Sequence, residues 1–71
     1  MAHAGGVKPC VSMQVVDGEL VIGSPTQTTV AVNDIDLIVQ RLACGEVVYC
    51  QLYGDLVGRV TRTVQMMLGG K

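Results

Sequence analysis

The chain has 71 residues, of which 49% are hydrophobic and only 15% are charged, and its formal net charge is −1 at pH 7. This length makes one domain whose own core supplies only a few kcal/mol of stability, and the charge excludes a protein that attracts nucleic acid over its whole surface. Because few charges offset so much apolar surface, the composition predicts a homo-oligomer whose subunits cover one another.

Two further classes are disfavoured by the residue pattern. The longest apolar run covers residues 47–50, whereas a membrane-spanning helix needs about 18 such residues, and the first six residues lack the apolar core of a signal peptide. We therefore expect a cytoplasmic protein. Cys10, Cys44 and Cys50 have no CxxC spacing, and only His3 offers an imidazole to join them. Reduced thiols are expected rather than a metal site.

The N-terminal part of the chain predicts an arm followed by a β-hairpin. Residues 1–9 are rich in Ala, Gly and Pro without periodicity, so they are expected to form a flexible arm before a single β domain over 10–71. Residues 11–15 alternate apolar and polar side chains, and residues 20–22 are apolar. The Asp17-Gly18 pair between them fits a type I′ turn, which joins two antiparallel strands.

The polar segment 23–29 contains Pro25 and is predicted to be a loop that leads into a strand over 29–32. Loops on a rigid sheet often carry binding groups, so Thr26, Thr28 and Thr29 are candidate ligand-binding residues. A plain connector is the alternative interpretation of this segment.

Residues 33–44 carry two competing patterns. Asp34 can cap a helix that ends before Gly45, and the apolar side chains at helical spacing are Ile35, Ile38, Val39 and Leu42. However, residues 35–39 also alternate like a strand, and their β-branched side chains lower helix propensity slightly. One short helix and a strand both remain open for this segment.

The last third of the chain is predicted to form two strands. Residues 47–53 are rich in β-branched and aromatic side chains and end at Gly54-Asp55. Residues 56–68 alternate with a period of two, which favours a long antiparallel strand with Arg59 on its polar face and Arg62 on the opposite face. The chain is therefore expected to be mostly β.

Three segments resemble the trp RNA-binding attenuation protein family. They are residues 17–23, with the sequence DGELVIG; Arg41-Leu42 followed by Gly45-Glu46-Val47 and Gln51; and Arg59 with Thr61. The resemblance implies a small antiparallel β-sandwich subunit that assembles into a ring. It also implies a cytoplasmic regulator of transcription attenuation or translation that binds repeated triplets of single-stranded RNA and responds to L-tryptophan held between subunits.

The same resemblance implies roles for individual residues. Arg41, Arg59 and Thr61 match positions that contact RNA, and Gln51 matches a glutamine of the tryptophan pocket. Tyr53 stands where the family has a pocket threonine, so the ligand is expected to be tryptophan or another small amino-acid-like molecule. Repetition around an oligomer would strengthen such sparse contacts, because linked sites gain effective concentration.

Two other classes compete with an RNA-binding regulator. A small oligomeric structural or protein-interaction module would have the same composition and would bind no nucleic acid. RNA binding weakens steeply as salt rises, whereas contacts between aliphatic surfaces do not, so salt dependence separates the two classes. We do not expect an enzyme, because the sequence shows no acid–base pair, activated nucleophile, phosphate loop or metal cluster.

Overall fold

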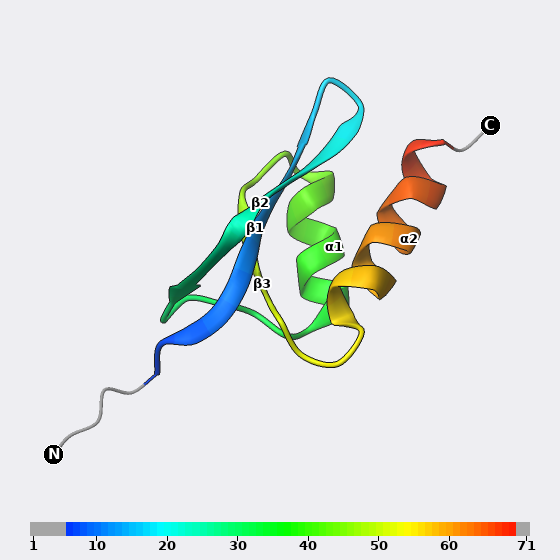
Figure 1. The fold of residues 1–71 in the computed structure, drawn as a ribbon. Helices are drawn as coiled ribbons and strands as arrows, with labels where there is room; N and C mark the ends of the chain where they lie inside the picture. The colour runs from blue at the N-terminus through cyan, green and yellow to red at the C-terminus, as the bar shows by residue number, and fades with distance from the viewer. Residues whose placement is uncertain (1–5, 70–71) are drawn as a thin grey trace, which may run out of the picture.

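A computed structural model of the chain describes residues 6–69, which form three strands and two helices in the order ββαβα (Figure 1). The elements are β1 (Lys8–Val16), β2 (Glu19–Thr28), α1 (Ile35–Ala43), β3 (Val48–Gln51) and α2 (Leu56–Leu68). β1 lies between β2 and β3 in one antiparallel sheet. The protein is therefore a small mixed α/β fold rather than a clear β-sandwich.

The hairpin predicted around Asp17-Gly18 is confirmed. Asp17 has φ 52° and Gly18 has φ 80°, the two positive values that a type I′ turn requires. Because β1 starts at Lys8, the first strand takes in part of the segment that was expected to be an arm. Residues 1–5, with His3, lie outside the described part of the chain.

The loop predicted over 23–29 is wrong, because β2 continues to Thr28 as the partner of β1. The register shifts between Val11 and Met13, where Ser12 faces both Gly23 and Ser24. A Cβ on Gly23 would overlap the Ser12 hydroxyl, which would then have to turn away. The bulge lets Pro25 sit within the strand, as proline does on sheet edges.

The strand predicted over 47–53 is found in shorter form as β3, whereas the one predicted over 29–32 is reduced to one bridge. Val32 lies parallel to Cys50, donates its N–H to the Tyr49 carbonyl at 2.7 Å and accepts from Gln51 N–H at 2.9 Å. This short contact covers the outer edge of β3.

Of the two patterns in residues 33–44, the helical one is confirmed. The Asp34 carboxylate accepts hydrogen bonds from the N–H groups of Asp36 and Leu37, at 3.0 and 3.2 Å. At the other end, Gly45 has φ 83°, and Glu46 N–H donates to the Arg41 carbonyl in a Schellman arrangement. Local capping signals therefore define both ends of α1.

The strand predicted over 56–68 is wrong, since this segment is helix α2. Its buried residues are Leu56, Val60 and Val64, at spacings of four. A spacing of four fits one face of a helix and also falls on one face of a strand, so the alternation was ambiguous. Burial of this stripe against the sheet is what stabilises the helix despite its β-branched side chains.

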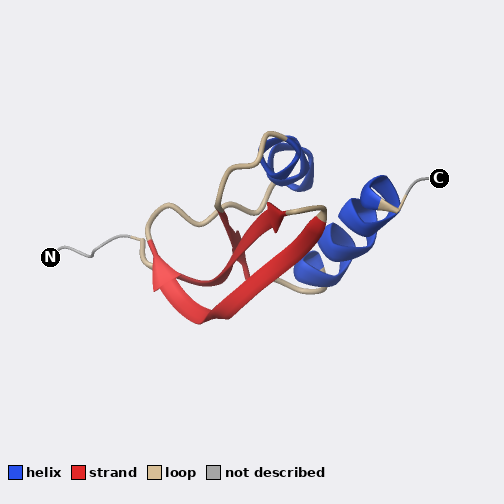
Figure 2. Cartoon of the chain, turned by 90° about the horizontal axis from the view of Figure 1, so that it is seen from above, coloured by secondary structure: helices blue, strands red, loops and turns tan. Residues whose placement is uncertain are grey.

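Both helices lie on the same side of the sheet (Figure 2), and the core fills the space between the two layers. The core side chains are Val11, Met13, Ile38, Leu42, Val48, Cys50, Leu56, Val60 and Val64. No described helix is long and apolar enough to cross a membrane.

The N-cap of α1 provides a direct test of this fold. Asp34→Ala removes two hydrogen bonds to helix N–H groups and should lower the free energy of unfolding by about 0.5–2 kcal/mol, whereas Asp34→Asn should keep most of it. Urea denaturation of the three proteins measures this. Equal stability of the alanine and wild-type proteins would contradict the capped helix.

Candidate functional site

The sheet has one face toward the helices and a second face that neither helix covers, on which Cys10 is nevertheless fully buried. Val11 and Met13 of β1 are part of the core, so Ser12 and its alternate neighbours point the other way, because side chains alternate along a strand. The register extends this second face across β2 and β3. We call it the open face; it carries Ser12, Gln14, Val21, Thr26, Tyr49 and Gln51.

The expected ligand-binding residues lie apart from one another on the sheet and in the turn after β2. Thr26 and Gln51 both pair with Cys10 from opposite sides, so they share the open face two strands apart, about 10 Å from each other. The Thr28 hydroxyl accepts from Val30 N–H at 3.3 Å, and the Gln51 amide donates to the Ala31 carbonyl at 3.4 Å. These groups stabilise the chain that follows β2, and Thr29 lies in the exposed turn there. Ligand binding by them stays a prediction.

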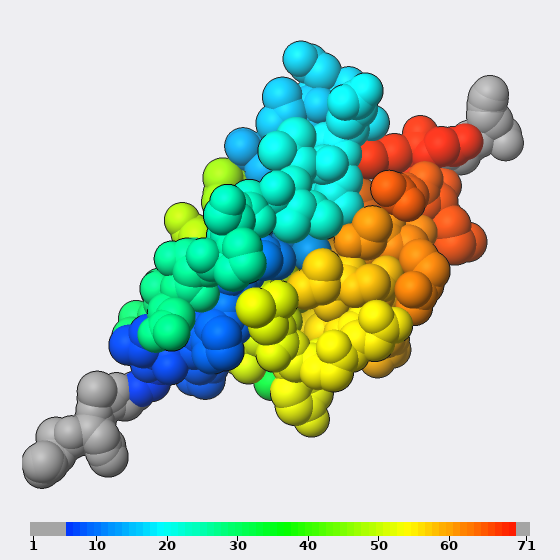
Figure 3. All heavy atoms as spheres, in the orientation of Figure 1, coloured from blue at the N-terminus to red at the C-terminus, as the bar shows by residue number. Residues whose placement is uncertain are grey.

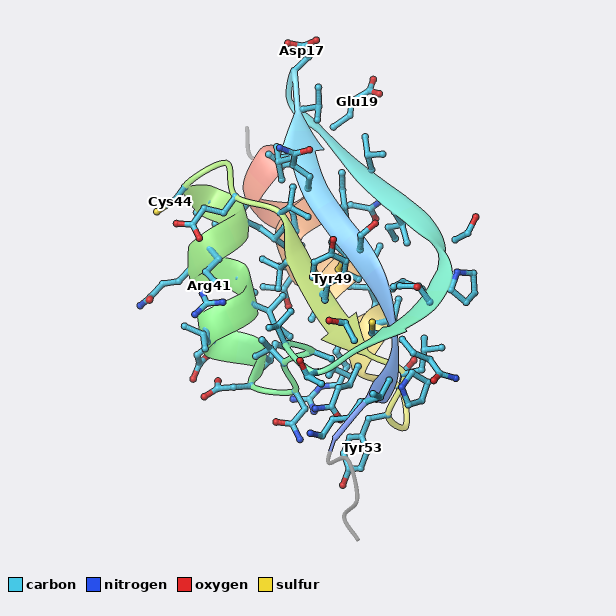
Figure 4. The ribbon with its side chains drawn as sticks, turned by 90° about the vertical axis from the view of Figure 1, so that its left-hand side faces the viewer. Asp17, Glu19, Arg41, Cys44, Tyr49 and Tyr53 are labelled. Carbon is cyan, nitrogen blue, oxygen red and sulfur yellow. The ribbon has the colours of Figure 1, made fainter. Side chains whose placement is uncertain are left out.

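The three residues matched to RNA contacts lie on different flanks of the helices. Residues two apart on a helix are separated by about 200°, so Arg59 and Thr61 point to opposite sides of α2. The strand face on which they were expected to lie together does not exist. Arg41 lies on α1, and Figure 4 shows it on the same side of the molecule as Tyr49.

A groove of about 740 Å³ runs between α1 and α2. Its lining consists of Ile35, Asp36, Val39, Gln40, Ala43, Arg59, Thr63 and Met67. A smaller groove of about 160 Å³, next to Tyr53 and Asp55, shares Ile35 and Arg59 with it. Arg41 is two residues from both Val39 and Ala43, so it lies on the flank of α1 away from this groove.

The two arginines of α2 have different surroundings. Arg62 donates a hydrogen bond to the Asp55 carboxylate at 2.9 Å, and both side chains are about two-thirds exposed. Exposed pairs of this kind contribute only about 0–1 kcal/mol. Arg62 was expected on the buried side of a strand, and it lies instead on the surface of a helix. Arg59 makes no ion pair among the described residues and contributes to both grooves.

The two tyrosines lie in different surroundings. Tyr49 is half-buried on the open face, whereas Tyr53 lies in the turn after β3 and is 66% exposed. Figure 4 shows Tyr49 near the middle of the sheet and Tyr53 at its end. Tyr49 lies on the edge strand β3, opposite Ser12 of β1, whereas Tyr53 has no strand beside it.

In the described part of the chain, the three cysteines do not come together to form a metal site. No group of three or more metal-binding side chains occurs among residues 6–69. Cys10 and Cys50 are fully buried, and Cys44 is exposed at the C-cap of α1. Burial raises the pKa of the Cys50 thiol, and the neighbouring Cys10 adds to this rise.

Comparison with known proteins identifies no relative of this chain. No family model, curated protein or solved structure matches the chain. The resemblance to the trp RNA-binding attenuation protein family therefore stays a prediction from three short sequence segments.

The thiols provide a test of the burial pattern. A thiol reagent at mildly alkaline pH should modify Cys44 quickly in the folded protein, whereas Cys10 and Cys50 should react only after unfolding. Peptide mass spectrometry after brief labelling identifies the modified residue. Rapid labelling of Cys50 in the native protein would show that β3 is not buried under the helices.

Proposed function

We propose that the protein is a small self-associating interaction module that binds protein surfaces through the uncovered parts of its sheet. The observation that carries this proposal is the exposure of β2. Of its ten residues only Leu20 and Thr28 are partly covered, and the apolar Val21 and Ile22 are 51% and 42% exposed. Figure 3 shows β2 as an uncovered band across one side of the molecule.

An exposed edge strand supports binding because its outward N–H and C=O groups can pair with another chain. The other edge of this sheet is not equivalent, since Val32 covers the middle of β3. Exposed apolar side chains also cluster at the end of α2, where Met66, Met67 and Leu68 are 77%, 52% and 40% exposed. Covering such surfaces would supply burial that a 71-residue chain lacks on its own.

Sedimentation of the wild-type protein tests the proposal. We expect a mass above that of the monomer at high micromolar concentration, decreasing on dilution. Added salt should not weaken the association, because apolar contacts and backbone hydrogen bonds carry it. A monodisperse monomer at all concentrations and salt levels would contradict the proposal.

A closed ring is the finer form of assembly that the family resemblance implies. Head-to-tail rings need two different surfaces on each subunit, whereas a twofold dimer needs one. Native mass spectrometry gives the number of subunits directly. Adding tryptophan to the same sample tests whether the ligand of that family binds.

Single-stranded RNA is a second candidate partner, and the observation that favours it is the position of Tyr49. A tyrosine ring on an open sheet can stack on an unpaired base, and the neutral polar side chains Ser12, Gln14 and Gln51 surround it with hydrogen-bonding groups. Arg41 lies on the same side of the molecule and can contact phosphate (Figure 4).

The two arginines provide matched variants for this candidate. If RNA binds the open face, Arg41→Ala should weaken binding of a single-stranded triplet-repeat RNA at low salt, while Arg59→Ala on the helix side should have little effect. Both residues are exposed, so each change should alter stability by less than about 0.5 kcal/mol. Fluorescence anisotropy measures the binding. If wild type binds no RNA at low salt, this candidate is wrong.

A further inference from the structure

The edge of β2 is available for pairing only along its first half. In the second half, Gly23 and Ser24 form the bulge opposite Ser12, and Pro25 has no N–H to donate. Bulges and prolines are the features by which edge strands resist pairing with other chains. The part of β2 that keeps regular strand geometry is therefore residues 19–22, followed by Gly23.

The turn determines which backbone groups of this half point outward. In a type I′ turn the carbonyl of Val16 accepts from Glu19 N–H, so these two residues form a hydrogen-bonded pair. Hydrogen-bonded and non-hydrogen-bonded pairs then alternate along an antiparallel ladder. Leu20 and Ile22 consequently direct their N–H and C=O groups away from β1, while Val21 bonds to Gln14.

We propose that residues 19–23 of β2 pair antiparallel with the same segment of a second copy, about a twofold axis at Val21. This inference rests on the proposed function and specifies its partner and register. Leu20 of each copy then lies opposite Ile22 of the other copy. Each of these two facing pairs exchanges two backbone N–H···O=C hydrogen bonds, which makes four in total. Two three-stranded sheets become one continuous six-stranded sheet.

The side chains favour this register because it places apolar residues of one copy opposite apolar residues of the other. Val21 meets Val21 of the second copy on the open face, and Leu20 meets Ile22 on the helix side. Such apolar cross-strand pairs contribute about 0.2–1 kcal/mol each. Glu19 of each copy lies opposite Gly23 of the other, so the two Glu19 carboxylates do not face each other.

The surroundings of the segment also suit a second copy. The hairpin and the end of α2 form a notch of about 320 Å³ lined by Gly18, Glu19, Leu20, Gln65 and Leu68. Leu68 in this notch is 40% exposed, and Ile22, further along β2, is 42% exposed. A second α2 brought alongside by the paired strands would cover both of these side chains.

A lysine scan along β2 tests the interface. Val21→Lys places two like charges opposite each other at the twofold axis and should weaken association about tenfold or more. Thr26→Lys puts the same charge on the same open face beyond the bulge and should change association less than about twofold. Sedimentation equilibrium measures both, and circular dichroism shows that each variant is folded.

A backbone variant separates hydrogen bonding from side-chain effects. Ile22→Pro removes an N–H that points outward and that the ladder with β1 does not use, so it should reduce association while keeping the hairpin. If wild type associates but Val21→Lys and Thr26→Lys weaken it equally or not at all, this interface is wrong and the proposed function stands. If wild type is monomeric throughout, both are wrong. Association that only Thr26→Lys disrupts would also overturn the inference.

Discussion

Strand β1 is the element on which the rest of the structure depends. It alone among the described strands has a full partner on each side, because β2 and β3 both pair with it and not with each other. Its buried side chains Val11 and Met13 also contact the helical layer. The hydrogen bonds and the core therefore share one nine-residue segment. Helix α1 packs on β1 and β3, and α2 packs on β2 and β3, the two strands that β1 holds. A change that displaced β1 would separate both strands and both helices together.

The parts of this fold that the sequence predicts well are those with strong local signals. Asp17-Gly18 has few alternatives to a type I′ turn, and the turn is present. Asp34 and Gly45 mark the two ends of α1, because a side-chain oxygen caps the first turn and a residue with positive φ ends the last. These features depend on a few neighbouring residues, so tertiary contacts did not override them.

The parts predicted wrongly depend on contacts between distant residues. Nothing local shows that residues 23–28 form a strand. Pairing with the continuing partner β1, and the bulge opposite Ser12, allow it. In α2, the spacing of Leu56, Val60 and Val64 fits both a helix and a strand, and only packing against the sheet decides between them. The candidate site changed for the same reason. Once 56–68 is a helix, Arg59 and Thr61 point apart, and the groove lined by Arg59 appears where no groove was expected.

The difference between the two sheet edges limits how far strand pairing can propagate. Val32 covers the β3 edge, and Pro25 with the bulge interrupts the far half of β2. If residues 19–23 of two chains pair with each other, neither copy keeps this stretch free. The described surface then has no equivalent strand edge with which a third chain could pair. In the proposed dimer, the bulge and the proline would therefore block fibril growth, the usual hazard of an apolar strand at a sheet edge.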